Sequence, residues 1–228
     1  MNILPIILAR GGSKRIPRKN VLSMAGKPMI AWTIECALNT KGLAPALVST
    51  DDAEIADVCR ARGANVPFLR PANLADDTAT SVDVVLHVLD WFSESGELVP
   101  EFILLLQPTS PLRIPADIEA CIKLQSEKNG SAVVSVCKSS QPAAFLKQVV
   151  DDGILAPFEV QESGKHFYYL NGAVYLVPTS VFIKEKMFVP QNTYAYEMPI
   201  ERSIDVDTPW DFYLADRILK DQNATFNS

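Results

Sequence analysis

Histidine and paired cysteine are scarce in this sequence of 228 residues. It has two isolated histidines, His87 and His166, and four cysteines that form no CxxC pair. A histidine-based zinc site needs several ligands brought together, so no such site is expected. Widely spaced cysteines instead predict small buried side chains in a protein from a reducing compartment.

A long apolar run and an excess of positive charge are also missing. The first apolar stretch, residues 3–9, is too short to span a membrane, and it lacks the charged leader and cleavage site of a signal peptide. We therefore expect a cytoplasmic protein. The formal net charge of −6 argues against nucleic acid as the main partner, because phosphate backbones favour basic surfaces.

Short, continuously apolar runs alternate with amphipathic stretches over the first 137 residues. Such runs are typical of parallel strands buried on both faces, and apolar residues three and four apart predict helices between them. The whole chain, residues 1–228, is expected to form one α/β domain with a mainly parallel twisted sheet and helices on both faces. The expected strands are residues 3–9, 45–50, 102–107 and 131–137, with a weaker one at 65–69.

The alternation breaks between residues 138 and 170. This stretch has several turn signals and no helical period, so we expect an inserted arm or an irregular β ribbon. A strand at 171–177 and a short helix near 179–186 follow. Thr208 is placed to cap a final helix that begins at Pro209.

Acidic residues are absent before Glu35, whereas cations gather in one loop. The segment LARGGSKRIPRKN, residues 8–20, follows the first expected strand and places five Arg or Lys residues around a glycine pair. Glycine lets the backbone approach a ligand closely, and arginine can bind phosphate oxygens through two parallel hydrogen bonds. The segment fits neither the Walker nor the dinucleotide glycine pattern. It predicts binding of a small phosphate chain; the alternative is a solvated loop with incidental charges.

A pair of alternating carboxylates lies near the end of the chain, in SIDVDTPWD. On an extended backbone Asp205 and Asp207 point the same way, and two like charges that close are costly unless a cation lies between them. Mg²⁺, a hard ion that prefers oxygen ligands, suits such a pair. The alternative is that one or both acids cap the helix that follows. Asp211 is assigned to the surface of that helix.

Two further loops are polar and stiff. LLLQPTSPLR, residues 104–113, is suited to contact a sugar or ribose, although a plain turn explains it equally well. In LRPANLADDTATS, residues 69–81, Arg70 could contact a base or a phosphate. Asp76, Asp77, Thr78 and Ser81 could equally cap the next helix.

Taken together, the motifs LARGGSKRIPRKN, VSTDD, LRPANLADDTATS, LLQPTSPLR, NGAVY and SIDVDTPWD occur in an order that resembles one family. These are the cytidylyltransferases of nine-carbon sugar acids, typified by the CMP-N-acylneuraminate (sialic acid) synthetases. The resemblance covers nearly the whole chain. It implies a Rossmann-like nucleotide-diphospho-sugar transferase fold and a reaction of CTP with a 2-keto sugar acid that gives the CMP-sugar and pyrophosphate. The anomeric hydroxyl would attack the α-phosphorus in line, with Mg²⁺, or alternatively Mn²⁺, at the leaving pyrophosphate.

The resemblance also implies roles for individual residues. Catalytic roles fall on Arg10, Lys19, Gln107 and Asp207. Nucleotide binding is implied for Arg10, Gly11, Ser13, Lys14, Asn20, Arg70 and Ser81. Sugar binding is implied for Gln107, Thr109, Ser110, Asn171 and Tyr175. The metal ligands would be Asp205 and Asp207.

Two departures from the family pattern leave the sugar acid open. GKHFYYLNG and SSQPAAFLK replace the basic stretch before the NG motif and the His-Pro-Leu-Lys-like opening of the arm. Lys147, Lys165 and His166 remain candidates for the cation that binds the sugar carboxylate. The substrate could be N-acetylneuraminate, legionaminate, pseudaminate or the eight-carbon acid of lipopolysaccharide. Outside the enzymes, the alternative is a regulatory module that binds nucleotide without turnover.

The resemblance further implies a homodimer in which the arm at 138–170 exchanges between subunits. The arm carries apolar residues that fit such an interface: Phe145, Leu146, Val149, Val150, Ile154, Leu155 and Phe158.

Overall fold

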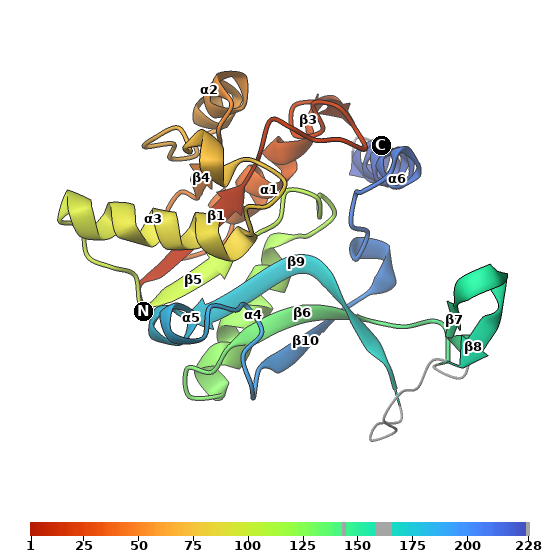
Figure 1. The fold of residues 1–228 in the computed structure, drawn as a ribbon. Coiled ribbons are helices and arrows are strands. Elements are labelled where there is room, and N and C mark those ends of the chain that lie inside the picture. The colour runs from red at the N-terminus through yellow and green to blue at the C-terminus, as the bar shows by residue number, and fades with distance from the viewer. Residues whose placement is uncertain (143–144, 158–165, 227–228) are drawn as a thin grey trace.

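The computed structural model describes residues 1–142, 145–157 and 166–226, and its centre is a six-stranded sheet in the order β10-β6-β9-β5-β1-β4 (Figure 1). β1 pairs in parallel with β4 and β5, β10 pairs in parallel with β6, and β9 runs antiparallel between β5 and β6. The predicted mainly parallel sheet is confirmed. The strands are β1 (Ile3–Leu8), β4 (Leu47–Ser49), β5 (Phe102–Leu105), β6 (Val133–Lys138), β9 (Tyr168–Pro178) and β10 (Tyr194–Met198).

Helices cover both faces of the sheet, as expected from the apolar periodicity. One face packs against α1 (Met29–Leu38), α2 (Ala53–Ala61) and α4 (Pro115–Glu127) through a fully apolar cluster. The other face packs against α3 (Ser81–Ser95) and α5 (Thr179–Glu185). The central strands lie between these two layers, which explains why their sequences are continuously apolar rather than alternating.

The final helix α6 (Pro209–Phe226) forms a third packing unit with the small hairpin of β2 (Ser23–Met24) and β3 (Lys27–Pro28). Met24 and Met29 are fully buried there against Ala215 and Leu219 of α6. This packing brings the chain just before α6 beside the loop that follows β1. Short 3₁₀ helices complete the described structure at Ala72–Leu74, Asp151–Gly153 and Ile200–Arg202.

Two details of the predicted strand set are wrong. Residues 65–69 form no strand; Asn65 makes a single parallel bridge to Leu47, and Pro67 offers no backbone N–H to extend it. β10 was not expected, because this edge strand is mostly exposed and carries the mixed sequence YAYEM instead of an apolar run.

The expected arm contains a short hairpin of β7 (Lys147–Val149) and β8 (Leu155–Pro157), which stands away from the central sheet (Figure 1). Its apolar side chains are exposed, with relative exposures of 72% for Phe145, 72% for Val149 and 67% for Leu155. Phe158 and Lys165, two residues named for the arm above, lie outside the described residues.

The four cysteines are all buried and free, which confirms their prediction as small core side chains. Within the described residues, none of the helices is both long and apolar enough to cross a membrane.

Candidate active site

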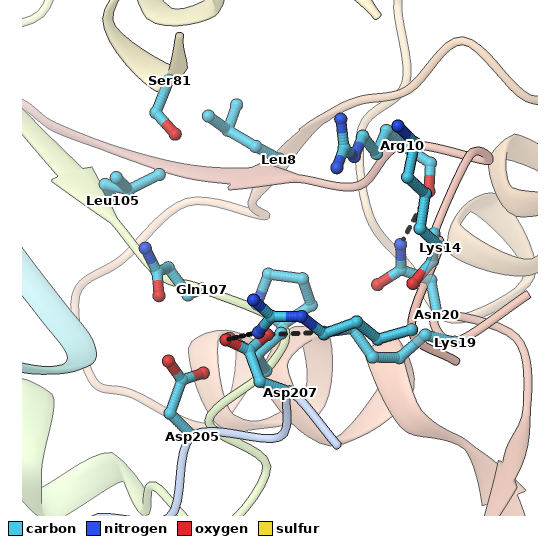
Figure 2. A pocket seen from close by; sticks show the side chains of 14 residues that line it. Leu8, Arg10, Lys14, Lys19, Asn20, Ser81, Leu105, Gln107, Asp205 and Asp207 are labelled. Carbon is cyan, nitrogen blue, oxygen red and sulfur yellow. Dashed lines mark hydrogen bonds and ion pairs between the residues drawn. The ribbon is translucent and has the colours of Figure 1, made fainter. Parts of the chain in front are cut away.

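A cavity of about 620 Å³ opens at the carboxyl ends of β1 and β5, where ligands commonly bind in open α/β sheets (Figure 2). Four segments far apart in the sequence line it: the end of β1 with the loop after it, the start of α3, the end of β5 with the loop after it, and the chain before α6. Most of the predicted site residues meet here. The lining consists of Leu8, Arg10, Ser13, Lys14, Arg15, Lys19, Asn20, Ser81, Leu105, Gln107, Pro108, Thr109, Asp205 and Asp207.

A second, smaller cavity of about 330 Å³ adjoins the first and shares Leu8, Arg10 and Ser81 with it. Arg70 lines only this second cavity. Its guanidinium is buried and donates to Ser49 Oγ (3.1 Å), to the Ser49 carbonyl and to the Leu74 carbonyl (3.3 Å). Burial lowers the pKa of Arg70 from its ordinary value. Arg10 therefore lies at the boundary between the two cavities.

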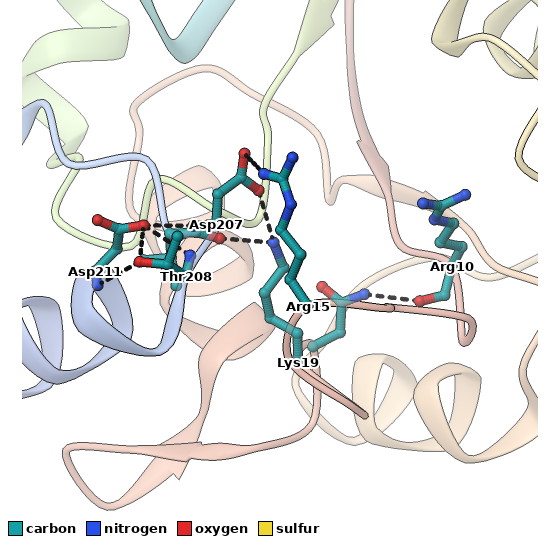
Figure 3. A network of polar contacts seen from close by, with 8 residues as sticks. Arg10, Arg15, Lys19, Asp207, Thr208 and Asp211 are labelled. Atoms are coloured by element: carbon teal, nitrogen blue, oxygen red, sulfur yellow. Dashed lines mark hydrogen bonds and ion pairs between the residues drawn. The ribbon is translucent and has the colours of Figure 1, made fainter. Parts of the chain in front are cut away.

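Two aspartates from distant segments pair with the cations of the loop after β1. Asp77 contacts Arg10 (3.3 Å) and Lys14 (2.5 Å). Asp207 contacts Arg15 (3.3 Å) and Lys19 (3.2 Å), as Figure 3 shows. Arg15 was not assigned a role from the sequence. The pairing with Asp77 and Asp207 spans more than sixty residues of chain, so sequence spacing gave no signal for it.

The other polar residues of the basic loop fix its shape. Asn20 is buried and donates from Nδ2 to the Arg10 carbonyl (3.1 Å). Gly11 lies outside the cavity lining; its N–H donates to Asp51 Oδ1 (3.0 Å), and a Cβ there would come within 2.7 Å of Asp52 Oδ2. Arg18 pairs with Asp52 and Glu54 at the start of α2 instead of lining the cavity.

The segment that carries the two predicted metal ligands is anchored to both neighbouring loops. Lys19 Nζ donates to the Val206 carbonyl (2.6 Å), and the Val206 N–H donates to the Thr109 carbonyl (2.8 Å). Burial raises the pKa of the Asp205 carboxyl, and the nearby charge of Asp207 raises it further. Both carboxylates line the same cavity, which agrees with the alternation argument from the sequence.

Capping of α6 falls on the residues after this pair. Thr208 Oγ1 accepts from the Asp211 N–H (3.3 Å), which confirms the predicted cap. Asp211 accepts from the N–H groups of Asp207 (3.1 Å) and Thr208 (2.7 Å), so it belongs to the cap as well as to the helix. Thr208 and Asp211 therefore cap α6. The side chains of Asp205 and Asp207 are not needed for the cap and are left for another role.

The NG motif, Asn171 and Gly172, contacts the loop after β5 from the interior of the protein. Asn171 is buried, donates to Ser203 Oγ (2.9 Å) and accepts from Ser135 Oγ (2.7 Å). Gly172 has φ of 74°, and a Cβ there would lie 2.5 Å from Gln107 Oε1. A side chain at Gly172 would therefore displace Gln107 from the cavity wall.

Three residues predicted to bind the sugar lie outside the cavity lining: Ser110, Asn171 and Tyr175. Ser110 is buried, and the Tyr175 ring packs against Phe188 with 5.8 Å between ring centroids. Their contacts are internal to the protein. A role in sugar binding for these three stays a prediction.

The two carboxylates fit a hard divalent cation. In the described part of the chain no three His, Cys, Asp or Glu residues cluster as a complete metal cage. Asp205 and Asp207 could still provide two oxygen ligands, and phosphate oxygens and water would complete the shell, as Mg²⁺ usually requires. Burial of Asp205 beside a second carboxylate disfavours its charged form, and a cation would relieve this cost.

The fold, a mainly parallel six-stranded sheet with helices on both faces, also occurs in proteins of known structure. Two solved structures share the fold: CMP:2-keto-3-deoxy-manno-octonic acid synthetase complexed with CTP, and 4-diphosphocytidyl-2C-methyl-D-erythritol synthase from Anaerococcus prevotii. The first has a TM-score of 0.74 at 18% identity, over 97% of this chain and 100% of that chain. The second has a TM-score of 0.68 at 14% identity, over 96% and 98%.

The family model described as cytidylyltransferase matches residues 4–226. The CMP-N,N'-diacetyllegionaminic acid synthase of Legionella pneumophila is 36% identical over 96% of this chain and 97% of its own length. The N-acylneuraminate cytidylyltransferase of Escherichia coli is 34% identical over 97% of this chain and 53% of its own, so this chain spans about half of that relative. The pseudaminic acid cytidylyltransferase of Campylobacter jejuni is 28% identical over 96% and 97%. The chain belongs to the cytidylyltransferase family, which confirms the family predicted from its motifs.

Proposed function

We propose that this protein joins CTP to a nine-carbon 2-keto sugar acid, such as N-acetylneuraminate or legionaminate, and releases pyrophosphate. The observation that carries the proposal is the cavity that places four cations of the loop after β1 opposite the Asp205–Asp207 pair. The names of the relatives support the substrate class, since all three act on acids of this kind.

The charges of the cavity suit the triphosphate. Arg10, Lys14 and Lys19 would bind phosphate oxygens through charge-assisted hydrogen bonds. The adjoining cavity, where Arg70 and Ser81 lie, would hold the base. The nucleotide would then extend along both cavities, with its α-phosphorus near Gln107.

In the proposed reaction the anomeric hydroxyl oxygen of the sugar acid forms a bond to the α-phosphorus and gives up its proton to water, while the bond from the α-phosphorus to the leaving pyrophosphate breaks on the opposite side. Lys19 and Arg15 would stabilise the charge that develops on the leaving group. Gln107, whose side chain has room because residue 172 is a glycine, would orient the ribose or the sugar acid. Mg²⁺ held by Asp205 and Asp207 would supply further neutralisation of phosphate charge.

Pyrophosphate release tests the proposal. The purified protein is given CTP and Mg²⁺ with N-acetylneuraminate, legionaminate, pseudaminate or the eight-carbon acid in parallel reactions. Release is expected with a nine-carbon acid and is expected to disappear when the metal is omitted. If no acid gave pyrophosphate release although CTP bound measurably, the proposal would be contradicted. That result would favour a nucleotide-binding regulatory module.

We also propose that the protein is a cytoplasmic homodimer whose arm, residues 138–170, packs on a second subunit. The exposed apolar side chains on the β7–β8 hairpin support this, because a monomer would leave them in water. Replacing Val149 and Leu155 together with Ser is expected to give a monomer in light scattering. The control is the pair Lys147→Ser and Asp151→Ser, exposed positions of the same arm, which should remain dimeric. A monomeric wild-type protein would contradict the proposal.

A further inference from the structure

Asp77 lies on the segment between α2 and α3 and faces the loop that follows β1. Its carboxylate pairs with Arg10 through Oδ1 (3.3 Å) and with Lys14 through Oδ2 (2.5 Å). Arg10 and Lys14 line the large cavity, and Asp77 lines the adjoining one. One carboxylate from outside the basic loop therefore bridges two of the cations that a phosphate chain would need.

The neighbouring Asp76 shows that this contact is not needed for the local turn. Asp76 Oδ1 accepts from the Thr78 N–H (2.8 Å), from Thr78 Oγ1 (2.7 Å) and from the Ala79 N–H (2.9 Å), so it closes the turn by itself. The side-chain contacts that the described residues give Asp77 are with Arg10 and Lys14. Thr80 and Asp83 cap α3 without it.

The ion pairs of Asp77 are weak enough to be exchanged. The side chains of Arg10, Lys14 and Asp77 are 41%, 74% and 54% exposed, and exposed pairs of this kind contribute little to stability. A triphosphate carries several negative charges and offers more acceptor oxygens than one carboxylate, so it can displace Asp77 from both cations. Once displaced, Asp77 remains near the phosphates as a like charge.

We propose that Asp77 acts as a resident competitor of the phosphate chain: it occupies Arg10 and Lys14 in the free protein and weakens binding of the triphosphate and of the pyrophosphate product. This inference rests on the proposed function for the identity of the nucleotide. For the product, the same competition would speed its departure, since the carboxylate is present to take back the two cations.

Asp77→Asn tests the competition, because it removes the charge and keeps the size of the side chain. Dissociation constants for CTP and for inorganic pyrophosphate are measured by calorimetry in low salt. Both ligands are expected to bind about threefold to tenfold more tightly to the variant, the range for losing two exposed ion pairs and a like charge. The gain should shrink as salt is added, because exposed charges are screened.

Two variants separate competition from net charge. Asp57→Asn removes the same charge on α2, where Asp57 pairs with Arg60 outside both cavities, and should leave both dissociation constants unchanged. Asp77→Glu keeps the carboxylate and should bind both ligands like the wild type.

Unchanged or weaker binding of both ligands by Asp77→Asn would overturn the inference, since it would mean that Asp77 is neutral or helps to position Arg10. Failure of the proposed function would look different. In that case none of the sugar acids would give pyrophosphate release with the wild type, whereas inorganic pyrophosphate would still bind more tightly to Asp77→Asn.

Discussion

Asp207→Asn is expected to lower kcat for pyrophosphate release by about 100-fold or more, which corresponds to several kcal/mol of lost transition-state stabilisation. The same variant should bind CTP at least as well as the wild type in the absence of metal. The reason for this contrast is that Asp207 pairs with Arg15 and Lys19 in the structure. Removing its charge frees both cations for phosphate, while it removes one of the two carboxylates that face the cavity.

The measurement combines steady-state pyrophosphate release with CTP binding by calorimetry, both compared with the wild type. A suitable control is Asp221→Asn, which removes the same charge from α6 at a position outside the cavity lining. Titration with Mg²⁺ gives a second readout, because the variant should need a much higher concentration of the ion for its residual activity. Turnover at the wild-type rate would contradict the metal assignment. Loss of CTP binding would instead make Asp207 a nucleotide ligand.

The sheet and the position of the site could be predicted from the sequence because both depend on local patterns. Residues 3–9 are continuously apolar, and the structure places β1 between two other strands and two helical layers, where only such a sequence fits. A loop that follows such a strand must lie at the carboxyl edge of the sheet. The basic loop at 8–20 and the polar turn at 104–113 therefore meet.

The orientation of side chains on β9 could not be predicted in the same way. Asn171 and Tyr175 are on a strand that runs antiparallel between β5 and β6, with hydrogen-bonded neighbours on both sides. Whether a given residue of such a strand faces a cavity or the core depends on its register against those neighbours, which are distant in the sequence, so the local pattern of β9 alone does not reveal it. The structure directs Asn171 into a network with Ser135 and Ser203.

Ion pairs between distant segments were the other feature that could not be predicted from the sequence. From the sequence, Asp77 was interpreted as a helix cap and Asp207 as a metal ligand. Neither interpretation predicts an arginine or lysine side chain as the partner. Their pairing with the basic loop depends on how the segment after β4 and the segment before α6 pack around the sheet. Cations that look unopposed within residues 8–20 are thus balanced in three dimensions by carboxylates that lie far along the chain.

The second large effect is expected for stability and concerns the buried aspartate at the start of α4. Asp117 has no exposed surface and accepts hydrogen bonds from the Ile114 N–H (3.0 Å), from Tyr196 Oη (3.1 Å) and from Arg202 Nε (3.0 Å) and Nη2 (2.6 Å). It thereby joins α4, β10 and the chain just before Asp205. Burial and the nearby carboxylate raise the pKa of Tyr196 to about 12, so its hydroxyl stays a donor at neutral pH.

Asp117→Ala should lower the free energy of unfolding by about 3–5 kcal/mol, because it leaves the charge of Arg202 partly buried without a partner. For a domain of this size the loss corresponds to a fall in Tm of roughly 10 °C. Asp117→Asn keeps the shape and some hydrogen bonds, so a smaller loss of about 1.5–3 kcal/mol is expected. Urea unfolding followed by circular dichroism measures both variants.

Asp57→Ala is the control for Asp117→Ala, because Asp57 is exposed on α2 and its replacement should change stability by less than about 0.5 kcal/mol. A loss below about 1 kcal/mol for Asp117→Ala would show that the network around Arg202 is easily replaced by water. A larger loss of unfolding free energy that increases from Asp117→Asn to Asp117→Ala would mean that buried Asp117, through Arg202, helps to hold the segment that carries Asp205 and Asp207. The position of the two carboxylates that we propose as metal ligands would then depend on a residue that lines neither cavity.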